Sequence, residues 1–249
     1  NQLEDKSGRQ PVSRGRVALL TNMLMLEKAR SQVAGFSGYS VNFHKHERID
    51  GEMQDPQVVS MDVRHKPFSV YMKWRKGGDR GRQLLFVPER NEGLAIVRLG
   101  GLKGRLLPPL RIEPDGSRAM AESRYPITQA GILPLIDAVI AYRKEDIESR
   151  TGVECLMFDD EEIEGRKVYS FKVTYPSSEV SSKYRIAYSY LDQETLVPIR
   201  LPNFAWACDT DDLTPEELDE QTLIEDYAFS GLEVTAQPQL AELFKKKKL

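Results

Sequence analysis

The stretch from Phe68 to Trp74 constrains the fold of this chain more than any other part of the sequence. Every second residue in it is apolar, namely Phe68, Val70, Met72 and Trp74. Side chains of a strand alternate between its two faces, so this pattern predicts a strand with one apolar face. Turn residues follow at 76–81, and the extended pattern resumes at 83–87. Together the two runs predict a long antiparallel hairpin.

The rest of the chain continues this strand-rich pattern and adds helices. Apolar residues recur at helical spacing over 17–34 and 132–140, and Thr214-Pro215-Glu216-Glu217 has the composition of a capped helix start. Further extended runs predict strands at 39–44, 58–63, 95–99, 153–158, 168–175, 184–191 and 223–229. An antiparallel sheet with helices over one face accommodates all of these segments.

Several motifs resemble a known family. They are Arg64, the run 66–74, Pro126-Ile127-Thr128 with Gly131-Ile132, and the run 196–200. They resemble the bacterial domain-of-unknown-function family 1571, over residues 17–234. That family resembles in fold the periplasmic outer-membrane lipoprotein carriers. The resemblance implies an α+β fold in which a strongly curved antiparallel sheet, a half-barrel, wraps two or three helices and encloses a hydrophobic cavity.

The sequence shows no linker that would divide it. We expect one domain over 17–244, preceded by a flexible polar segment at 1–16 and followed by a basic tail at 245–249. No apolar run is long enough to span a membrane. The family resemblance implies a periplasmic or otherwise extracytoplasmic location, with a signal peptide already removed. Cys155 and Cys208 fit either one disulfide or two buried thiols, and the sequence leaves both open.

Charge is segregated along the chain. From Arg64 to Arg105 there are eleven Lys or Arg residues and three acidic ones, whereas Leu201 to Phe244 has eleven acidic residues and no Lys or Arg. Two interpretations follow. Either the basic and acidic zones neutralise each other in the fold, or the basic zone faces an anionic partner such as a membrane surface or a protein.

Motifs that build known active sites or cofactor sites are absent from the sequence, so we expect no cofactor. His44 and His46 share one face of a predicted strand but face water, so no metal site is expected. His65 has no evident partner, and its cationic neighbours favour the neutral ring. The acidic run 159–162 is interpreted as a solvated turn.

The basic hairpin also carries aromatic residues, which raises the question of nucleic acid. Base stacking needs aromatic rings on the charged face. Phe68 and Trp74 alternate with the charges and so point inward, and only Tyr71 shares the face of Lys73 and Arg75. We therefore do not expect a nucleic-acid partner.

The sequence and the resemblance together favour a non-enzymatic binding or carrier protein for a lipid, an acyl chain or another hydrophobic ligand. The residues expected to line its cavity are Phe68, Val70, Met72, Trp74, Phe86, Met23 and Val139. Arg64, Lys73 and Arg75 are expected at the rim, where they would meet a negative head group. Two alternatives stay open. One is an interaction module with a filled core that acts through its charged surface zones, and the other is an enzyme with an unrecognised site.

Overall fold

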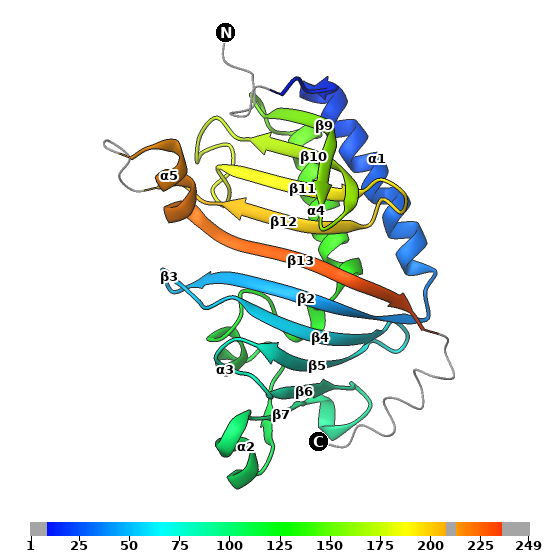
Figure 1. Cartoon of the computed structure of the whole chain (residues 1–249), viewed down its shortest axis with the longest axis vertical. Coiled ribbons are helices and arrows are strands. Elements are labelled where there is room, and N and C mark those ends of the chain that lie inside the picture. The colour runs from blue at the N-terminus through cyan, green and yellow to red at the C-terminus, as the bar shows by residue number, and fades with distance from the viewer. Residues whose placement is uncertain (1–8, 208–212, 236–249) are drawn as a thin grey trace. The chain divides into compact units, whose positions relative to one another are not determined.

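The computed structural model describes residues 9–207 and 213–235, except for the side chains of Lys103 and Arg105. Its helices are α1 (Gly15–Ala34), α2 (Gly101–Leu106), α3 (Ser117–Met120), α4 (Ile132–Glu148) and α5 (Pro215–Thr222). Its strands are β1 (Ser13–Arg14), β2 (Gly38–Ile49), β3 (Glu52–Met53), β4 (Gln57–Arg64), β5 (Ser69–Lys76), β6 (Gln83–Phe86), β7 (Ala95–Arg98), β8 (Leu110–Ile112), β9 (Glu154–Ile163), β10 (Arg166–Thr174), β11 (Ile186–Asp192), β12 (Pro198–Phe204) and β13 (Leu223–Val234). The fold is α+β with a large antiparallel sheet that is not closed, which confirms the predicted class (Figure 1).

The contacts of the chain group it into two compact units. Unit 1 holds residues 1–31 and 136–226, and unit 2 holds residues 32–135 and 227–249. Three elements, α1, α4 and β13, run from one unit into the other. The expectation of one domain over 17–244 stays a prediction, and the expected basic tail lies outside the described residues.

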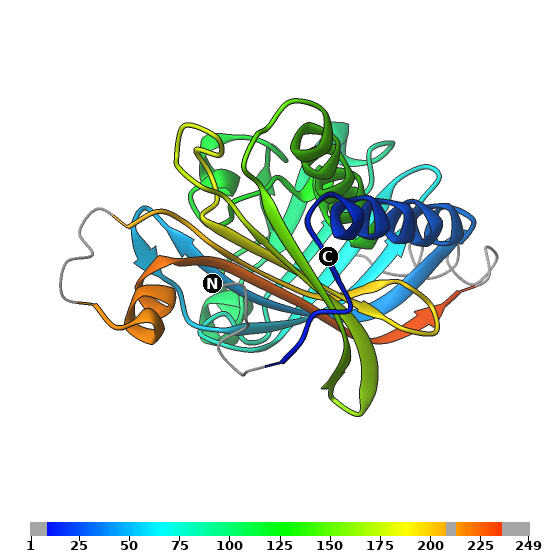
Figure 2. The ribbon, with the colours of Figure 1, turned by 90° about the horizontal axis from the view of Figure 1, so that it is seen from above.

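Unit 1 is an antiparallel sheet with two helices on one face. Its strands follow the order β1, β9, β10, β11, β12 and the first residues of β13. Figure 2 shows α1 and α4 on the same side of these strands. Asn22 of α1 donates from Nδ2 to the Ser189 Oγ of β11 over 3.1 Å, and both side chains are buried. The odd-numbered residues of β11 therefore face the helices.

The segment just before α1 differs from the sequence-based expectation. Residues 9–14 were placed in a flexible polar stretch, yet Ser13 and Arg14 form β1 and pair with Met157 and Leu156 of β9. Val12 also donates its amide to the Met157 carbonyl over 2.9 Å. Backbone pairing with an existing strand needs no apolar period in the added segment, so hydropathy gave no sign of it.

Unit 2 contains the predicted hairpin. Its strands follow the order β13 (residues 227–234), β2, β4, β5, β6, β7 and β8, and β3 pairs with β2. Within the hairpin, Val70 lies opposite Phe86 and Met72 lies opposite Leu84. The antiparallel meander expected from the sequence is thus confirmed.

One feature of β5 was predicted wrongly. The alternating pattern placed Tyr71 on a solvent face, but only 8% of Tyr71 is exposed, and Ser69 is fully buried. The Tyr71 hydroxyl donates to Gln83 Oε1 of β6 over 2.7 Å. Polar contacts between neighbouring strands therefore cover part of the second face of β5, which a simple count of apolar residues does not register.

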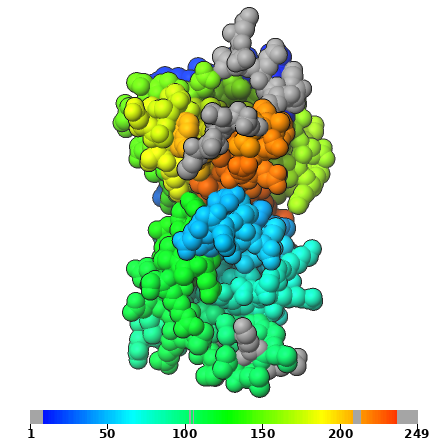
Figure 3. Space-filling model, turned by 90° about the vertical axis from the view of Figure 1, so that its left-hand side faces the viewer, coloured from blue at the N-terminus to red at the C-terminus, as the bar shows by residue number. Residues whose placement is uncertain are grey.

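The helix starts follow the local chemistry of the chain. Thr214 caps α5: its Oγ1 accepts from the Glu217 amide, and the Glu217 carboxylate accepts from the Thr214 amide, which confirms the predicted capping box. Figure 3 shows α5, in orange, at the surface of unit 1. At the start of α4, the Ile132 amide donates to the Tyr39 hydroxyl over 2.7 Å. Across residues 9–207 and 213–235, no helix has both the length and the apolar content needed to cross a bilayer.

Candidate functional site

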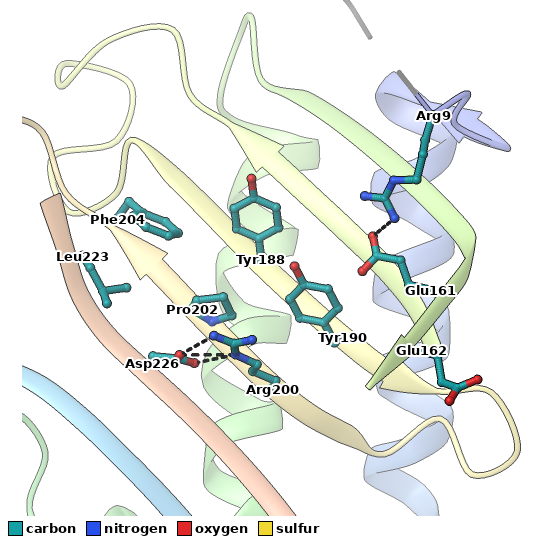
Figure 4. A pocket seen from close by; sticks show the side chains of 10 residues that line it. All are labelled: Arg9, Glu161, Glu162, Tyr188, Tyr190, Arg200, Pro202, Phe204, Leu223 and Asp226. Carbon is teal, nitrogen blue, oxygen red and sulfur yellow. Dashed lines mark hydrogen bonds and ion pairs between the residues drawn. The ribbon is translucent and has the colours of Figure 1, made fainter. Parts of the chain in front are cut away.

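An open hollow lies on the outer face of the unit 1 sheet. Because Ser189 faces the helices, its neighbours Tyr188 and Tyr190 project from the opposite face of β11. Figure 4 shows these two rings with side chains from the adjoining strands around them. The hollow has a volume of about 440 Å³. It is lined by Arg9, Glu161, Glu162, Tyr188, Tyr190, Arg200, Pro202, Phe204, Leu223 and Asp226.

Aromatic rings form the floor of this hollow. The rings of Tyr188 and Tyr190 are stacked, with centroids 6.1 Å apart and planes inclined by 5°. Phe204 of β12 meets Tyr188 edge-on, at a centroid distance of 5.9 Å. The Lys172 ammonium of β10 lies 5.8 Å from the centre of the Tyr188 ring. The floor is thus a broad aromatic surface, half-exposed to solvent and bordered by a cation.

Two ion pairs border the floor. Arg200 Nη2 of β12 contacts Asp226 Oδ2 of β13 over 2.7 Å, and Arg200 Nε lies 3.1 Å from Asp226 Oδ1. This pairing is bidentate, the strong geometry for a guanidinium and a carboxylate. Arg9 pairs with Glu161 of β9, and Glu161 also accepts from Ser170 Oγ over 2.8 Å. Each carboxylate is therefore oriented by a partner before any ligand arrives.

The surroundings of the hollow favour the protonated form of the Tyr190 hydroxyl. Burial, together with the nearby Glu161 carboxylate, raises the pKa of Tyr190 to about 12. The hydrogen bond to Asp226 raises the pKa of Arg200 above its ordinary value. The ten lining residues include no histidine, cysteine, serine or threonine. The arrangement can stack against a ligand and hydrogen-bond to it.

The hairpin residues predicted to line a cavity lie together in unit 2. Val70, Met72, Trp74 and Phe86 are all buried, with at most 8% of each exposed, and Phe68 is half-buried. The Phe68 and Phe86 rings are 6.2 Å apart. Trp74 is held by a hydrogen bond from Nε1 to Gln57 Oε1 over 3.0 Å, and the Arg82 guanidinium lies over its ring. These contacts give the hairpin face a packed character.

The two remaining predicted cavity residues belong to unit 1. Met23 of α1 and Val139 of α4 are both half-buried. They do not line the hollow described above. Their role as ligand contacts stays a prediction.

The predicted rim residues have local structural partners. Arg64 donates from Nε to the Pro67 carbonyl over 3.0 Å and from Nη2 to Ser69 Oγ over 2.7 Å. It therefore ties down the turn between β4 and β5, in which the Lys66–Pro67 peptide is cis. Arg75 is exposed and donates to Ser60 Oγ over 3.0 Å, and Lys73 is half-buried. Of the three, Arg75 presents the most accessible charge.

The acidic run 159–162 was interpreted as a turn, and this was wrong. Strand β9 continues to Ile163, and the turn to β10 is made by Glu164 and Gly165, whose φ angles are 50° and 77°. Two carboxylates of the run, those of Glu161 and Glu162, therefore lie along a strand beside the hollow. The positive φ at Gly165 costs little, because glycine has no Cβ, and this places the turn there.

Two of the histidines, His44 and His65, have hydrogen-bonding partners. No group of three His, Cys, Asp or Glu side chains in the part of the chain that the structure describes could hold an ion. His44 contacts Ser230 Oγ over 2.9 Å. Contrary to expectation, His65 has a partner, since its Nδ1 lies 2.9 Å from the Phe36 carbonyl. Burial is the main cause that lowers the pKa of His65, and Lys66 adds to it.

The acidic and basic zones find partners locally. Asp219 and Asp226, from the acidic stretch, pair with Arg185 and Arg200 inside unit 1. Arg82, from the basic stretch, pairs with Glu122 over 2.5 Å inside unit 2.

Cys155 is fully buried, which raises the pKa of its thiol to about 12. Cys208 lies outside the described residues, so the disulfide question keeps both of its answers.

The sequence belongs to a family of proteins of unknown function, DUF1571, whose profile matches residues 36–247. This confirms the family expected from the motifs. No curated protein matches the chain.

Solved structures with a similar chain path include two mycobacterial proteins and a LolA superfamily protein. The lipoprotein LppX of Mycobacterium tuberculosis is 12% identical, with 87% of this chain and 97% of that chain covered and a TM-score of 0.48. LprF of Mycobacterium bovis is 13% identical, with 88% and 97% covered and a TM-score of 0.45. The LolA superfamily protein of Nitrosomonas europaea is 12% identical, with 90% and 97% covered and a TM-score of 0.33. Likenesses of this size assign no function to the chain.

Sequence reasoning missed the hollow because its residues come from distant segments. Tyr188 and Tyr190 do alternate along β11, and Arg200 lies in one of the motifs that indicated the family. However, the contacts of Arg200 with Asp226, and of Arg9 with Glu161, depend on strand register and on β1. The one signal available in the sequence was the Tyr-Ser-Tyr spacing.

Proposed function

We propose that the protein is a non-enzymatic binding or carrier protein for a lipid, an acylated molecule or another amphipathic ligand, and that it acts outside the cytoplasm. The observation that carries the proposal is the hollow on unit 1, which combines an aromatic floor with a bordering set of charges. Its volume of about 440 Å³ lies within the range of roughly 300–1,000 Å³ that is usual for ligand sites.

The hollow has an aromatic floor and a charged border, and this arrangement suits an amphipathic ligand. The floor formed by Tyr188, Tyr190 and Phe204 would cover apolar surface, at roughly 25 cal/mol for each Å² removed from water. Arg9 and Arg200 border the floor, and their positive charges would attract an anionic head group. Binding of this kind requires shielding and orientation, and no bond has to be made or broken.

The hairpin of unit 2 provides a second contact surface in this proposal. Phe68, Val70, Met72, Trp74 and Phe86 would supply apolar area there. Phe68 keeps partial exposure, so it is the member of this set that a ligand could reach. Arg75 would meet a negative head group there, because its guanidinium is exposed. Met23 and Val139, which are also partly exposed, would be contacts within unit 1.

A second candidate function is an interaction module with a filled core. The burial of Val70, Met72, Trp74 and Phe86 favours it, since these side chains already pack against protein. In that case the protein would act through a partner bound at its surface. The hollow gives an enzymatic role little support, because burial raises the pKa of Tyr190 and two of the three lining carboxylates, those of Glu161 and Asp226, are ion-paired.

The test is purification from the native compartment without detergent, followed by mass spectrometry of the organic extract. The carrier proposal predicts a co-purifying lipid at about one molecule per chain. An extract without lipid, together with no binding of fluorescent fatty-acid probes, would favour the interaction module. Comparison of Tyr190→Ala with Phe68→Ala would show whether the hollow or the hairpin holds the lipid.

A further inference from the structure

A short apolar segment of unit 2 lies exposed at the surface. Helix α2 follows β7 and lies beyond it at the end of the unit 2 sheet (Figure 1). Leu102 is 74% exposed, Leu106 is 81% exposed and Leu107, which follows the helix, is 51% exposed. Pro108 continues the exposed stretch. Three leucines within six residues are thus left in water, whereas scattered single apolar residues are normal on protein surfaces.

This leucine tip is held by close backbone packing. A Cβ at Gly100 would lie 2.4 Å from the Arg80 carbonyl oxygen, so the chain entering α2 touches the turn between β5 and β6. Gly101 then turns the chain into the helix with a φ of 58°. The position of the tip therefore depends on Gly100 and Gly101, where a larger side chain would clash or strain the backbone.

Two exposed arginines lie next to the leucine tip in the chain or the fold. Arg98, at the end of β7, and Arg80, whose backbone contacts Gly100, are both exposed. Arg98 precedes the tip by a few residues in the chain, and Arg80 meets it through the backbone. They belong to the basic zone of the hairpin, which carries eleven Lys or Arg residues against three acids.

Leucines among cations match the surface of an anionic bilayer. Apolar side chains enter the boundary between head groups and acyl chains, while Lys and Arg attract the anionic head groups. A bilayer also accepts a projecting tip of any outline. A protein partner would instead have to provide an apolar pocket lined with acidic groups.

We infer that the leucine tip, Leu102, Leu106 and Leu107 with Arg80 and Arg98, is a docking surface for an anionic membrane. The tip would insert its leucines at the level of the head groups and anchor through the arginines. This inference goes beyond ligand binding, since docking would take place whether or not the hollow is occupied. It gives the protein a means of reaching the membrane at which a lipid is taken up or delivered.

Co-sedimentation of the full chain with vesicles tests the inference. Vesicles of phosphatidylcholine with phosphatidylglycerol are compared with vesicles of phosphatidylcholine alone. The wild type should bind the anionic vesicles. The double variant Leu102→Ser with Leu106→Ser should bind them with an affinity lower by roughly tenfold or more. The matched control is Val17→Ser with Leu24→Ser, because Val17 and Leu24 of α1 are also exposed, at 65% and 60%. This control should bind as the wild type does.

The charge arm uses Arg80→Gln with Arg98→Gln. This variant should bind the anionic vesicles more weakly and should lose part of the salt sensitivity seen with the wild type. Thermal melting checks that every variant is folded. The inference is overturned if the wild type does not bind anionic vesicles, or if the leucine variant binds them as well as the wild type. Equal losses in the Val17 and Leu24 control would also overturn it, because adsorption would then not depend on the tip.

Discussion

Tyr188 and Tyr190 lie side by side on the outer face of β11, with ring centroids 6.1 Å apart and planes that differ by 5°. Residues two apart on a strand share a face, so the strand itself sets this spacing. Phe204 closes one end of the pair and Arg200, which lies opposite Tyr190 in the sheet, borders the other. The result is a half-exposed aromatic surface whose spacing is set by the sheet.

Such a surface is preorganised for binding. The Arg200 and Asp226 side chains are fixed by their bidentate pairing, and Glu161 is fixed by Arg9 and Ser170. A ligand that stacks on the rings would meet polar groups that already point along the border. Little side-chain entropy is then lost on binding, which favours affinity in a site of modest area.

Gly131→Ala should destabilise the fold. A Cβ at this position would lie 2.6 Å from the Tyr39 hydroxyl, and the backbone φ of 111° is one that alanine rarely adopts. The expected loss in the free energy of unfolding is about 3 kcal/mol, measured by urea denaturation. Gly93→Ala is the control, because its φ is also positive, at 76°, but nothing lies within 4 Å of the added Cβ. Equal losses in the two variants would show that the contact with Tyr39 has no effect.

Arg64→Lys should weaken the hairpin even though it keeps the charge. The guanidinium reaches both the Pro67 carbonyl and Ser69 Oγ, and an ammonium cannot reproduce that fork. We expect a loss of about 1–2 kcal/mol in the free energy of unfolding. Arg75→Lys, at an exposed site with one hydrogen bond, should change it by less than about 0.5 kcal/mol. A head-group role for Arg64 would instead leave stability unchanged and lower lipid binding.

Asp192→Asn should show a pH-dependent cost. Burial alone would raise the pKa of Asp192, but hydrogen bonds from Thr195 and the ion pair with Arg166 outweigh it and hold the pKa below its ordinary value of 3.8. A lowered pKa contributes stability above the unfolded value, and this contribution is lost as the pH falls through the folded value. The variant should therefore be less stable by about 1–3 kcal/mol at neutral pH.

The measurement for Asp192 is thermal or urea unfolding across the acid range. The difference between wild type and Asp192→Asn should shrink as the pH falls below about 4. Asp55→Asn, at an exposed position, is the control and should show no such trend. A stability difference that does not change with pH would mean that the carboxylate charge of Asp192 does not stabilise the fold.

Cys155 should resist thiol reagents in the folded protein. It is fully buried and its pKa is raised to about 12, so almost no thiolate forms at neutral pH. In a Cys208→Ser background, labelling should proceed only at the rate of unfolding and should become fast in denaturant. Since the folded pKa is raised, the burial of this thiol also costs stability above the unfolded value of 9.0. Rapid labelling of the native protein would contradict the buried placement.

Local patterns predicted the elements, and long-range register decided the site. Thr214 and Glu217 predict the start of α5, because a capping box is complete within four residues. The alternation from Phe68 to Trp74 likewise predicts its strand. No local pattern predicts the ion pair between Arg200 and Asp226, because it depends on the register of β12 against β13. The burial of Tyr71 was missed for the same reason, since it depends on Gln83 in the next strand.

The most direct test of the proposed function is a binding titration with a fluorescent fatty acid. The wild type should bind the probe. The double variant Tyr188→Ala with Tyr190→Ala should bind it with an affinity lower by roughly tenfold or more, because the two tyrosine rings of the floor are removed. Tyr169→Ala truncates a tyrosine that is not among the lining residues, and this variant should bind as the wild type does. If the wild type does not bind the probe, or if the double variant binds it as tightly as the wild type, the hollow is not a site for an amphipathic ligand.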